Sequence, residues 1–399
     1  MKIALVSPYD FASPGGVVSH ISCLERQFTQ MGHEVKIIAP ASKAEIISAR
    51  LGDRFIRIGT PRPVPVSGSI ARITLSLRIE SQIKEVFARE EFDICHLHEP
   101  LMPTLCTTVL RLKKCPMVGT FHASGGKPWY TMFSPIMKWY LDRWFHKLDG
   151  RIAVSPVAHR YVNKYFPSDY EIIPNGVDTH HFNSNIAPLE RFADGKVNIV
   201  FVGRLEKRKG FDYLLEAYRR VKAEVPDCRL IQVGPGVRLR KQYEKYIRRH
   251  NLQDVFLTGY ATYADLPRYY KTADIVCFPN TGWESQGIVL LEAMSVGKPI
   301  VASNIEGFTS VLTDDVEGIA VPPRNAESLA DAIARLMKDK QLREQMGNRG
   351  KPKAMQYDWS LLAKKLLDFY AKTLENIKHN GAESEQTRLM LAPFQENIE

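Results

Sequence analysis

The chain has 399 residues, of which 44 % are hydrophobic and 25 % are charged, and its formal net charge is +10. This length accommodates two domains, and the composition is typical of a soluble globular protein and not of a disordered or fibrous one. No apolar run reaches the length of a transmembrane helix, and the first apolar run is too short for a signal peptide. The positive charge favours an anionic partner without choosing among a nucleotide, a membrane and a nucleic acid.

The cysteines lie apart in apolar segments and form no C-x-x-C pair, so we expect reduced core cysteines in a cytosolic protein. The six are Cys23, Cys95, Cys106, Cys115, Cys228 and Cys277.

Short apolar runs rich in β-branched residues predict strands along the whole chain. In the first half they cover residues 2–7, 34–39, 92–97, 117–120, 150–154 and 170–173. In the second half they cover residues 198–202, 229–233, 255–257, 275–278, 299–302 and 318–321. Amphipathic segments between them predict helices, for example over residues 18–31, 213–225, 288–296 and 327–338.

Strands that alternate with helices and are nearly all apolar indicate parallel sheets covered on both faces, the α/β class. The series occurs twice, with a polar break at residues 183–196. We therefore expect two doubly wound, Rossmann-like domains, residues 1–185 and 186–358, that face each other across a cleft. Ligands then bind at the carboxyl ends of the strands. Residues 379–399 lack a helical pattern and are expected to form a mobile tail.

The first strand is followed by Gly15 and Gly16 at the start of a helix. Paired glycines let backbone N–H groups approach an anion, although a simple tight turn is an equal alternative. The chain has neither G-x-G-x-x-G nor G-x-x-x-x-G-K-[ST]. The usual signatures of dinucleotide oxidoreductases and P-loop hydrolases are therefore missing.

A basic loop follows the strand predicted at 198–202, and it includes Arg204 and Lys209. Several cations at the carboxyl end of a strand suit a diphosphate, whose negative charge must be stabilised as it leaves. The alternative is a solvated basic loop without a ligand.

Two carboxylates, Glu284 and Glu292, flank the start of a predicted helix. Helical rise separates them by about 12 Å, whereas the carboxyls of a retaining glycosidase lie about 5 Å apart. The spacing suits two contacts on one extended ligand, one to a sugar and one to a ribose, with Gly287 letting backbone amides reach a diphosphate. A solvent-exposed pair is the alternative.

His122 also follows a strand, and Lys127 lies five residues later. A single histidine is more often structural than functional, so the pattern alone does not decide its role.

Taken in order, these motifs resemble the large family of retaining glycosyltransferases with the GT-B fold, family four. The shared motifs are the Gly15–Gly16 loop, Thr120-Phe121-His122, Pro174-Asn175-Gly176-Val177-Asp178, Gly203-Arg204 with Lys209-Gly210, and the two glutamates. Further segments resemble the bacterial phosphatidylinositol α-mannosyltransferases, which use GDP-mannose. These segments are Pro8-Tyr9, Ser19-His20, Pro63-Val64-Pro65, Gly68-Ser69-Ile70-Ala71-Arg72, His98-Glu99-Pro100 and Tyr357-Asp358-Trp359-Ser360.

The resemblance implies a role for each matching residue. For the donor, Gly16 approaches the diphosphate, Arg204 and Lys209 neutralise it, Glu284 holds mannose hydroxyls, Ile288 packs nearby and Glu292 binds the ribose. For the acceptor and the reacting sugar, it implies Tyr9 and His122, with Lys127 meeting the acceptor's phosphate. It also implies that a helix over residues 359–378 crosses back to the first domain.

The chain departs from this pattern at two places. Gln286 replaces the usual aromatic residue before Gly287. The branch carries a polybasic, membrane-docking helix in its first domain, whereas residues 75–86 here mix both signs of charge.

A different segment has the composition of a membrane interface. It contains three of the five tryptophans together with basic residues: Trp129, Lys138, Trp139, Arg143 and Trp144. Aromatic and basic residues on one amphipathic segment favour the headgroup layer. Core packing or a dimer interface is the alternative.

We therefore predict a retaining hexosyltransferase that moves mannose from GDP-mannose to a lipid such as phosphatidylinositol. It would act as a peripheral protein at the cytoplasmic face of the cell membrane and need no metal or other cofactor. A UDP-sugar transferase that makes another glycolipid or a cell-surface glycan is one alternative, and an inactive sugar-nucleotide-binding scaffold is another. No nucleic-acid-binding module is recognised, and a homo-oligomer is compatible with the sequence.

Overall fold

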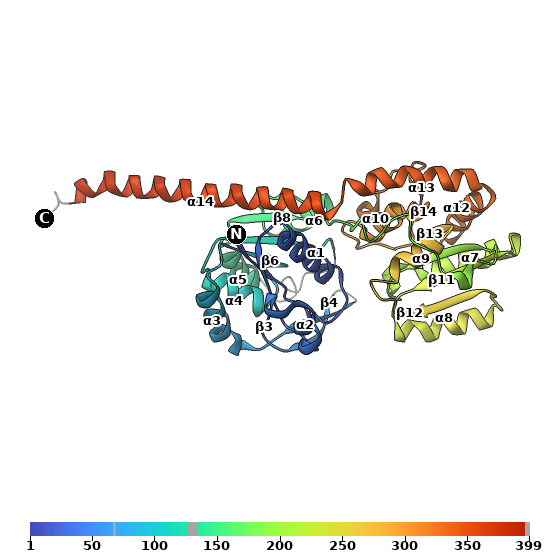
Figure 1. Cartoon of the computed structure of the whole chain (residues 1–399), viewed down its shortest axis with the longest axis horizontal. Helices are drawn as coiled ribbons and strands as arrows, with labels where there is room; N and C mark the ends of the chain where they lie inside the picture. The colour runs from blue at the N-terminus through green and yellow to red at the C-terminus, as the bar shows by residue number, and fades with distance from the viewer. Residues whose placement is uncertain (67–68, 126–134, 396–399) are drawn as a thin grey trace.

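The computed structural model describes residues 1–66, 69–125 and 135–395, with side chains in α5 (Pro135–Phe145) from residue 138 and in α14 (Trp359–Gln395) up to residue 379. It has two α/β lobes side by side, each built on a parallel sheet (Figure 1). The long helix α14 runs back from the second lobe along the first (Figure 1). The predicted architecture of two doubly wound domains is confirmed.

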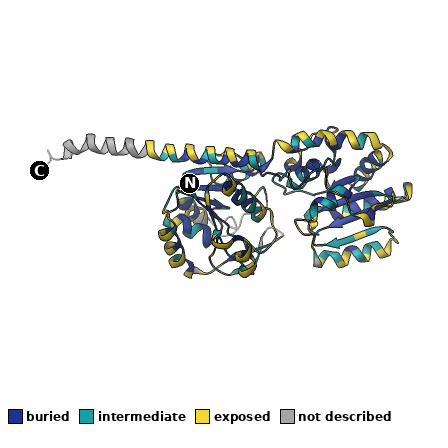
Figure 2. Cartoon of the chain, in the orientation of Figure 1, coloured by how far each residue is buried: buried dark blue, intermediate teal, exposed yellow. Residues whose placement is uncertain are grey.

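The first sheet has seven parallel strands, in the order β3-β2-β1-β6-β7-β8-β9. Their bounds are β1 Lys2–Val6, β2 Glu34–Ala39, β3 Phe55–Arg57, β6 Ile94–His98, β7 Met117–Phe121, β8 Gly150–Ala153 and β9 Glu171–Ile172. The helices of this domain are α1 Gly16–Gln30, α2 Ala44–Leu51, α3 Glu80–Glu90, α4 Leu105–Leu112, α5 and α6 Pro156–Asn163. The central strands are buried on both faces, as their continuous apolar sequence predicts (Figure 2).

The second sheet has six parallel strands, in the order β12-β11-β10-β13-β14-β15. Their bounds are β10 Val197–Val202, β11 Cys228–Val233, β12 Val255–Gly259, β13 Ile275–Phe278, β14 Ile300–Ser303 and β15 Gly318–Val321. The helices are α7 Phe211–Glu224, α8 Val237–Arg249, α9 Leu266–Thr272, α10 Ile288–Ser295, α11 Glu306–Thr309, α12 Ala326–Lys338 and α13 Lys340–Met355. All twelve predicted strands occur, with ends that differ by one or two residues.

A hairpin in the first domain was not predicted. Strands β4 (Pro61–Val66) and β5 (Ser69–Thr74) pair antiparallel, although three of the six residues in β4 are prolines. A proline cannot donate a hydrogen bond to a sheet, so such a strand is confined to an edge. Strand β5 pairs in turn with Tyr9 through a bridge at Ile73. The hairpin therefore covers the residue that the resemblance places at the acceptor.

Two chain segments connect the domains, and they pair with each other. The Val177 N–H donates to the Tyr357 carbonyl at 2.9 Å, and the Trp359 N–H donates to the Val177 carbonyl at 3.2 Å. Trp359 opens α14, whose first turns bury Leu362, Leu366 and Tyr370 against the core of the first domain. The last helix of the chain therefore belongs to the packing of the first domain.

The end of the chain differs from the expectation. Helix α14 continues to Gln395, so residues 379–395 are helical where the sequence pattern indicated a non-helical tail. Helical hydrogen bonding propagates one residue at a time from a nucleus that packing has already formed, so a weak pattern can continue a strong helix.

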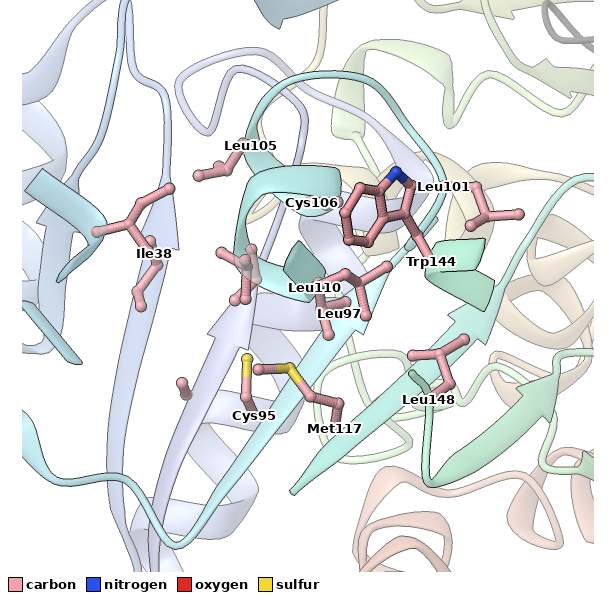
Figure 3. Close-up of a cluster of buried hydrophobic side chains, with 14 of the residues drawn as sticks. Ile38, Cys95, Leu97, Leu101, Leu105, Cys106, Leu110, Met117, Trp144 and Leu148 are labelled. Atoms are coloured by element: carbon pink, nitrogen blue, oxygen red, sulfur yellow. The ribbon is translucent and has the colours of Figure 1, made fainter. Parts of the chain in front are cut away.

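The fold places the side chains of the predicted membrane segment in two different environments. Trp139 is 69 % exposed, and Lys138 and Arg143 are also exposed on α5. Trp144 is only 6 % exposed and packs in the core among Leu97, Cys106 and Leu148, so its assignment to a membrane surface is wrong (Figure 3). The reason is helical geometry, since Trp144 lies on the face of α5 turned toward the sheet. Lys127 and Trp129 lie outside the described residues.

In the described part of the chain, no helix has the length and the apolar character needed to cross a bilayer. The six cysteines are free thiols, and four of them are buried.

The two tryptophans of α5 give a direct test of this packing. Trp144→Ser should lower the free energy of unfolding by about 3–5 kcal/mol, the usual cost of truncating a large buried side chain. Trp139→Ser on the same helix should change it by less than about 0.5 kcal/mol, because the side chain is in solvent. Urea unfolding followed by circular dichroism measures both. Equal effects would place the two rings in the same environment and contradict the fold of α5.

Candidate active site

The candidate site residues of the first domain gather at the carboxyl edge of its sheet. His98 ends β6, His122 follows β7 directly, and His20 lies in the second turn of α1, the helix after β1. Parallel strands bring all their carboxyl ends to one edge, so residues 102 positions apart in the sequence meet there. The sequence analysis assigned a role only to His122.

The three imidazoles form a cluster. The His98 Nδ1 atom lies 3.1 Å from the His122 Nε2 atom, within hydrogen-bond distance. The His20 ring centroid is 4.9 Å from that of His122 and 5.0 Å from that of His98. Behind them, the His96 ring is held by Thr120 and by the Tyr370 hydroxyl, at 2.6 Å each. Tyr370 belongs to α14, so the returning helix supports the floor of the site.

Burial keeps these histidines neutral at pH 7. It lowers the pKa of His20 to about 4, against a hydrogen bond to Asn175 that raises it. Burial also lowers the pKa of His98 and His122 well below the usual value, and the neighbouring histidines add to the effect. His122 therefore offers a neutral ring that can donate or accept a hydrogen bond, and not a cation.

Glu99 follows His98 and was quoted in the sequence analysis only as part of a motif. It has a left-handed backbone, with φ = 51°, and accepts hydrogen bonds from the N–H groups of His122 at 2.7 Å and Ala123 at 2.9 Å. Burial nevertheless raises its pKa to about 7. Burial also raises the pKa of Tyr9 well above its usual value, and the negative charge of Glu99 adds to this. Glu99 therefore anchors the backbone that presents His122.

The same three histidines are the described residues that could hold a metal ion, since one ring nitrogen of each lies within 4.8 Å of the others. Two hydrogen bonds occupy three of their ring nitrogens: one bond joins His98 to His122, and the other joins His20 to Asn175. The cluster is therefore already a hydrogen-bonded unit.

In the second domain, Lys209 and Glu284 form one ion pair. The Lys209 Nζ atom lies 2.5 Å from the Glu284 carboxylate, and the Arg208 guanidinium lies 3.6 Å from it. Gly210 makes this approach possible: its φ is 68°, and a Cβ there would lie 1.9 Å from the Pro279 carbonyl oxygen. The basic loop is therefore pressed against the end of β13.

The charges of this pair are held by the protein. Burial acts to raise the pKa of Glu284, but Lys209, Arg208 and a hydrogen bond from Asn280 outweigh it, and the pKa lies below its usual value. Burial lowers the pKa of Lys209, and Glu284 opposes this. Arg204 is about half exposed and pairs with Glu206 at 3.2 Å. In this loop the Lys209 ammonium group is therefore enclosed, whereas the Arg204 guanidinium faces solvent.

Glu292 lies on the first helix turns after Gly287 and has a different partner from Glu284. The Tyr270 hydroxyl donates to its carboxylate at 2.6 Å. Burial raises the pKa of Glu292 to about 7, although the bond from Tyr270 lowers it. The two glutamates therefore have different partners, and their contacts with two parts of one ligand stay a prediction.

Two glycine turns leave backbone N–H groups at helix starts. Gly287 has φ = 78°, and a Cβ there would lie 2.6 Å from the Phe308 ring, so α10 begins in a turn that favours glycine. Ile288 is the first residue of α10 and is half-buried. Gly15 and Gly16 begin α1 and are exposed, with open space where their Cβ atoms would be.

The two halves of the site meet through a buried contact. Gln286, which is 2 % exposed, forms hydrogen bonds to Asn175, and Asn175 bonds to His20 at 2.8 Å. A Cβ on Gly125 would lie 2.8 Å from the Trp283 ring. Loops of the second domain therefore contact Asn175, which binds His20, and the loop after His122.

Among the predicted site residues, the structure pairs Lys209 with Glu284 and places Tyr9 near the Glu99–His122 turn. Arg204 and Glu292 have other partners, Glu206 and Tyr270. The Gly15–Gly16 turn lies apart from these pairs at the start of α1. The sequence analysis assigned no role to His20, His98, Glu99, Asn175 or Arg208. For His98, Glu99, Asn175 and Arg208, the signal in the sequence was a position in the loop after a predicted strand, whereas His20 lies inside a predicted helix and gave no such signal.

Comparison with known proteins agrees with this geometry. Residues 14–181 match the family described as Glycosyltransferase Family 4, and residues 184–353 match the family described as Glycosyl transferases group 1.

Among curated relatives, the phosphatidyl-myo-inositol mannosyltransferase of Mycobacterium tuberculosis is 36 % identical over 389 residues, covering 96 % of this chain and 98 % of that protein. The protein of the same name from Mycolicibacterium smegmatis is 34 % identical over 371 residues, covering 93 % of each chain.

Solved structures share the fold. A glycosyltransferase from Rickettsia africae matches with a TM-score of 0.78 and 19 % identity, covering 94 % of this chain and 99 % of that one. HepE from Anabaena, solved with UDP-glucose, matches with a TM-score of 0.74 and 17 % identity, covering 93 % and 100 %. On the family matches and the near-full-length identity to curated relatives, the chain belongs to the family 4 glycosyltransferases with the GT-B fold.

Proposed function

We propose that this protein transfers mannose from GDP-mannose to an inositol phospholipid with retention of the anomeric configuration. One observation supports the substrates above all: the identity of 34–36 % to phosphatidyl-myo-inositol mannosyltransferases spans nearly the whole chain. The arrangement of charges at the two strand edges supports the reaction type.

The donor would lie along the second domain from Glu292 to Lys209. Glu292 would accept hydrogen bonds from the ribose hydroxyls, and the amides at the start of α10 and of α1 would meet the diphosphate. Arg204 and Lys209 would add positive charge where negative charge develops as the GDP leaves, a contribution worth about 10²–10³ in rate per donor in comparable sites. Glu284, already beside Lys209, would hold the mannose hydroxyls next to the diphosphate.

Transfer would occur on one face of the sugar. The acceptor hydroxyl attacks the anomeric carbon as the bond to the phosphate oxygen breaks, and the leaving phosphate takes the acceptor's proton. A neutral His122 would hydrogen-bond the reacting sugar from the first domain, together with Tyr9 at the acceptor. The low pKa of His122 suits this role, since a cation there would oppose the positive charge that develops on the sugar ring.

The activity can be tested with purified protein, GDP-mannose and vesicles that contain phosphatidylinositol. We expect GDP release together with a mannosylated lipid detected by mass spectrometry, and tighter binding of GDP than of UDP by calorimetry. Turnover of UDP-sugars in place of GDP-mannose would overturn the donor assignment. Nucleotide binding without turnover of any sugar nucleotide would favour the inactive scaffold.

The role of Glu292 can be tested through pH. Its pKa of about 7 means that the carboxylate is mostly protonated at pH 6 and mostly ionised at pH 8. If it accepts hydrogen bonds from the ribose, GDP affinity should fall about tenfold from pH 8 to pH 6 because of this group. Calorimetry at both pH values measures the change in GDP affinity. Glu292→Gln corrects for the ionisation of GDP itself, since this variant should lack the tenfold change that comes from Glu292.

Glu99→Gln is the matched control for that experiment, because Glu99 has the same raised pKa but lies in the first domain. It should keep the wild-type pH dependence of GDP binding. If Glu292→Gln also keeps it, Glu292 does not contact the nucleotide.

We further propose that α5 contacts the cytoplasmic face of the membrane through Lys138, Trp139 and Arg143. These side chains are exposed on one helix, and tryptophan and basic residues favour an anionic headgroup layer. Helix α3 does not offer a polybasic surface, since its Glu80 pairs with both Lys84 and Arg111.

The membrane surface can be tested by co-sedimentation with anionic vesicles. The variant Lys138→Gln, Trp139→Ser, Arg143→Gln should bind at least about 30-fold more weakly, since each basic residue near such a surface contributes about 1 kcal/mol. The control Tyr260→Ser, Arg248→Gln, Arg249→Gln removes the same kinds of exposed side chain from the second domain and should bind as the wild type does. Equal binding by both variants would show that α5 is not the anchor.

A further inference from the structure

The amide of Gln286 is oriented by backbone groups alone. Its Oε1 atom accepts from the Asn175 N–H at 2.6 Å, and its Nε2 atom donates to the Asn175 carbonyl at 2.9 Å. A backbone N–H can only donate and a carbonyl can only accept, so the two ends of this amide cannot be exchanged. Both side chains are almost fully buried, at 2 % and 4 % exposed, so water does not compete for these bonds.

The orientation of Gln286 determines that of the Asn175 side chain. The Gln286 Oε1 atom lies 2.9 Å from the side-chain amide of Asn175 and requires a donor there, which is Nδ2. The Oδ1 atom of Asn175 must then point the other way, where it lies 2.8 Å from the Nδ1 atom of His20. An amide flip would leave two acceptors facing each other at Gln286.

The orientation of Asn175 in turn determines the tautomer of His20. Because Oδ1 can only accept, the His20 Nδ1 atom must carry a hydrogen. With a pKa of about 4 the ring is neutral at pH 7, so its Nε2 atom carries a lone pair and acts as an acceptor. The His20 ring packs edge-on against the His122 ring, with the ring centroids 4.9 Å apart. One amide in the second domain therefore fixes which nitrogen of His20 donates and which accepts.

We propose that Gln286 is a positioning residue: it sets the His20 tautomer through Asn175 and thereby holds His122 in the orientation used for transfer. The role of His122 rests on the proposed function, whereas the tautomer of His20 does not. The link also joins the two domains, since Gln286 precedes α10 and His20 lies in α1. The His20 tautomer is therefore set only while the loop that carries Gln286 contacts the loop that carries Asn175.

The test uses full-length Gln286→Met, which keeps the length and burial of the side chain but has no hydrogen-bonding amide. Nitrogen-15 NMR of the histidine rings distinguishes the Nδ1–H from the Nε2–H tautomer, and the His20 signals are assigned from a His20→Asn sample. In the wild type we expect the Nδ1–H form. In Gln286→Met we expect a mixture with the Nε2–H form, a kcat lowered about tenfold, and a GDP affinity within about twofold of the wild type.

Two further variants separate positioning from packing. Gln286→Glu keeps the acceptor for both Asn175 donors, and burial favours the protonated carboxyl, whose O–H can donate to the Asn175 carbonyl. This variant should therefore retain the Nδ1–H form and recover most of the kcat. Asn198→Leu removes another buried amide of the second domain, at the far end of β10, and should leave the tautomer and kcat unchanged after correction for the folded fraction.

The proposal is overturned if His20 keeps the Nδ1–H form in Gln286→Met, or if the tautomer changes while kcat does not. Should the wild type transfer no sugar at all, the NMR comparison still decides whether Gln286 sets the tautomer, so a failure of the proposed function and a failure of this inference are distinguishable.

Discussion

The geometry of the site depends on one pairing, that of the two segments that connect the domains. Val177 and Trp359 exchange backbone hydrogen bonds with the opposite segment, and Asp358 accepts from the N–H and hydroxyl of Thr179. Gly176 lets the segments come this close, since a Cβ there would lie 2.6 Å from the Trp359 ring. The pairing places Asn175, the residue before Gly176, between the histidine cluster and Gln286. The segments that connect the domains therefore also build the site.

Burial then determines the protonation states of the groups at the carboxyl edge of each sheet. It raises the pKa of Glu99 and Glu292 to about 7 and keeps the histidines neutral, while Glu284 stays ionised because Lys209 and Arg208 surround it. The same physical cause gives different results because the neighbours differ: a carboxylate beside two cations remains charged, and one beside a tyrosine hydroxyl is close to its titration point at pH 7. The site therefore has a charged end at Lys209 and Glu284 and a neutral end at the histidine cluster.

Unusual backbone conformations in several loops also position the residues of the site. Glu99 and Trp283 both have a positive φ, which is costly for residues with a side chain. Glu99 holds the loop that carries His122, and Trp283 lies against Gly125 of the first domain. Gly210 and Gly287 have positive φ at no such cost and bring the basic loop and the start of α10 into place. Two of the nine described non-glycine residues with a positive φ, Glu99 and Trp283, therefore lie in loops of the candidate site.

The sequence by itself determined the two parallel sheets, because nearly continuous apolar strands and amphipathic helices can be buried only in that way. It also placed His122 and the basic loop with Lys209 after predicted strands, and therefore at the carboxyl edges of the sheets. Their roles, and those of Glu284 and Glu292, came from the family resemblance and stay predictions. It could not separate Trp139 from Trp144, because their burial depends on how α5 is rotated against the sheet, and a weak pattern hid the helical continuation to Gln395. Nor could it identify the contacts of Gln286 with Asn175 and of Asn175 with His20. These join residues 111 and 155 positions apart, and only the packing of the two domains brings them within hydrogen-bond distance.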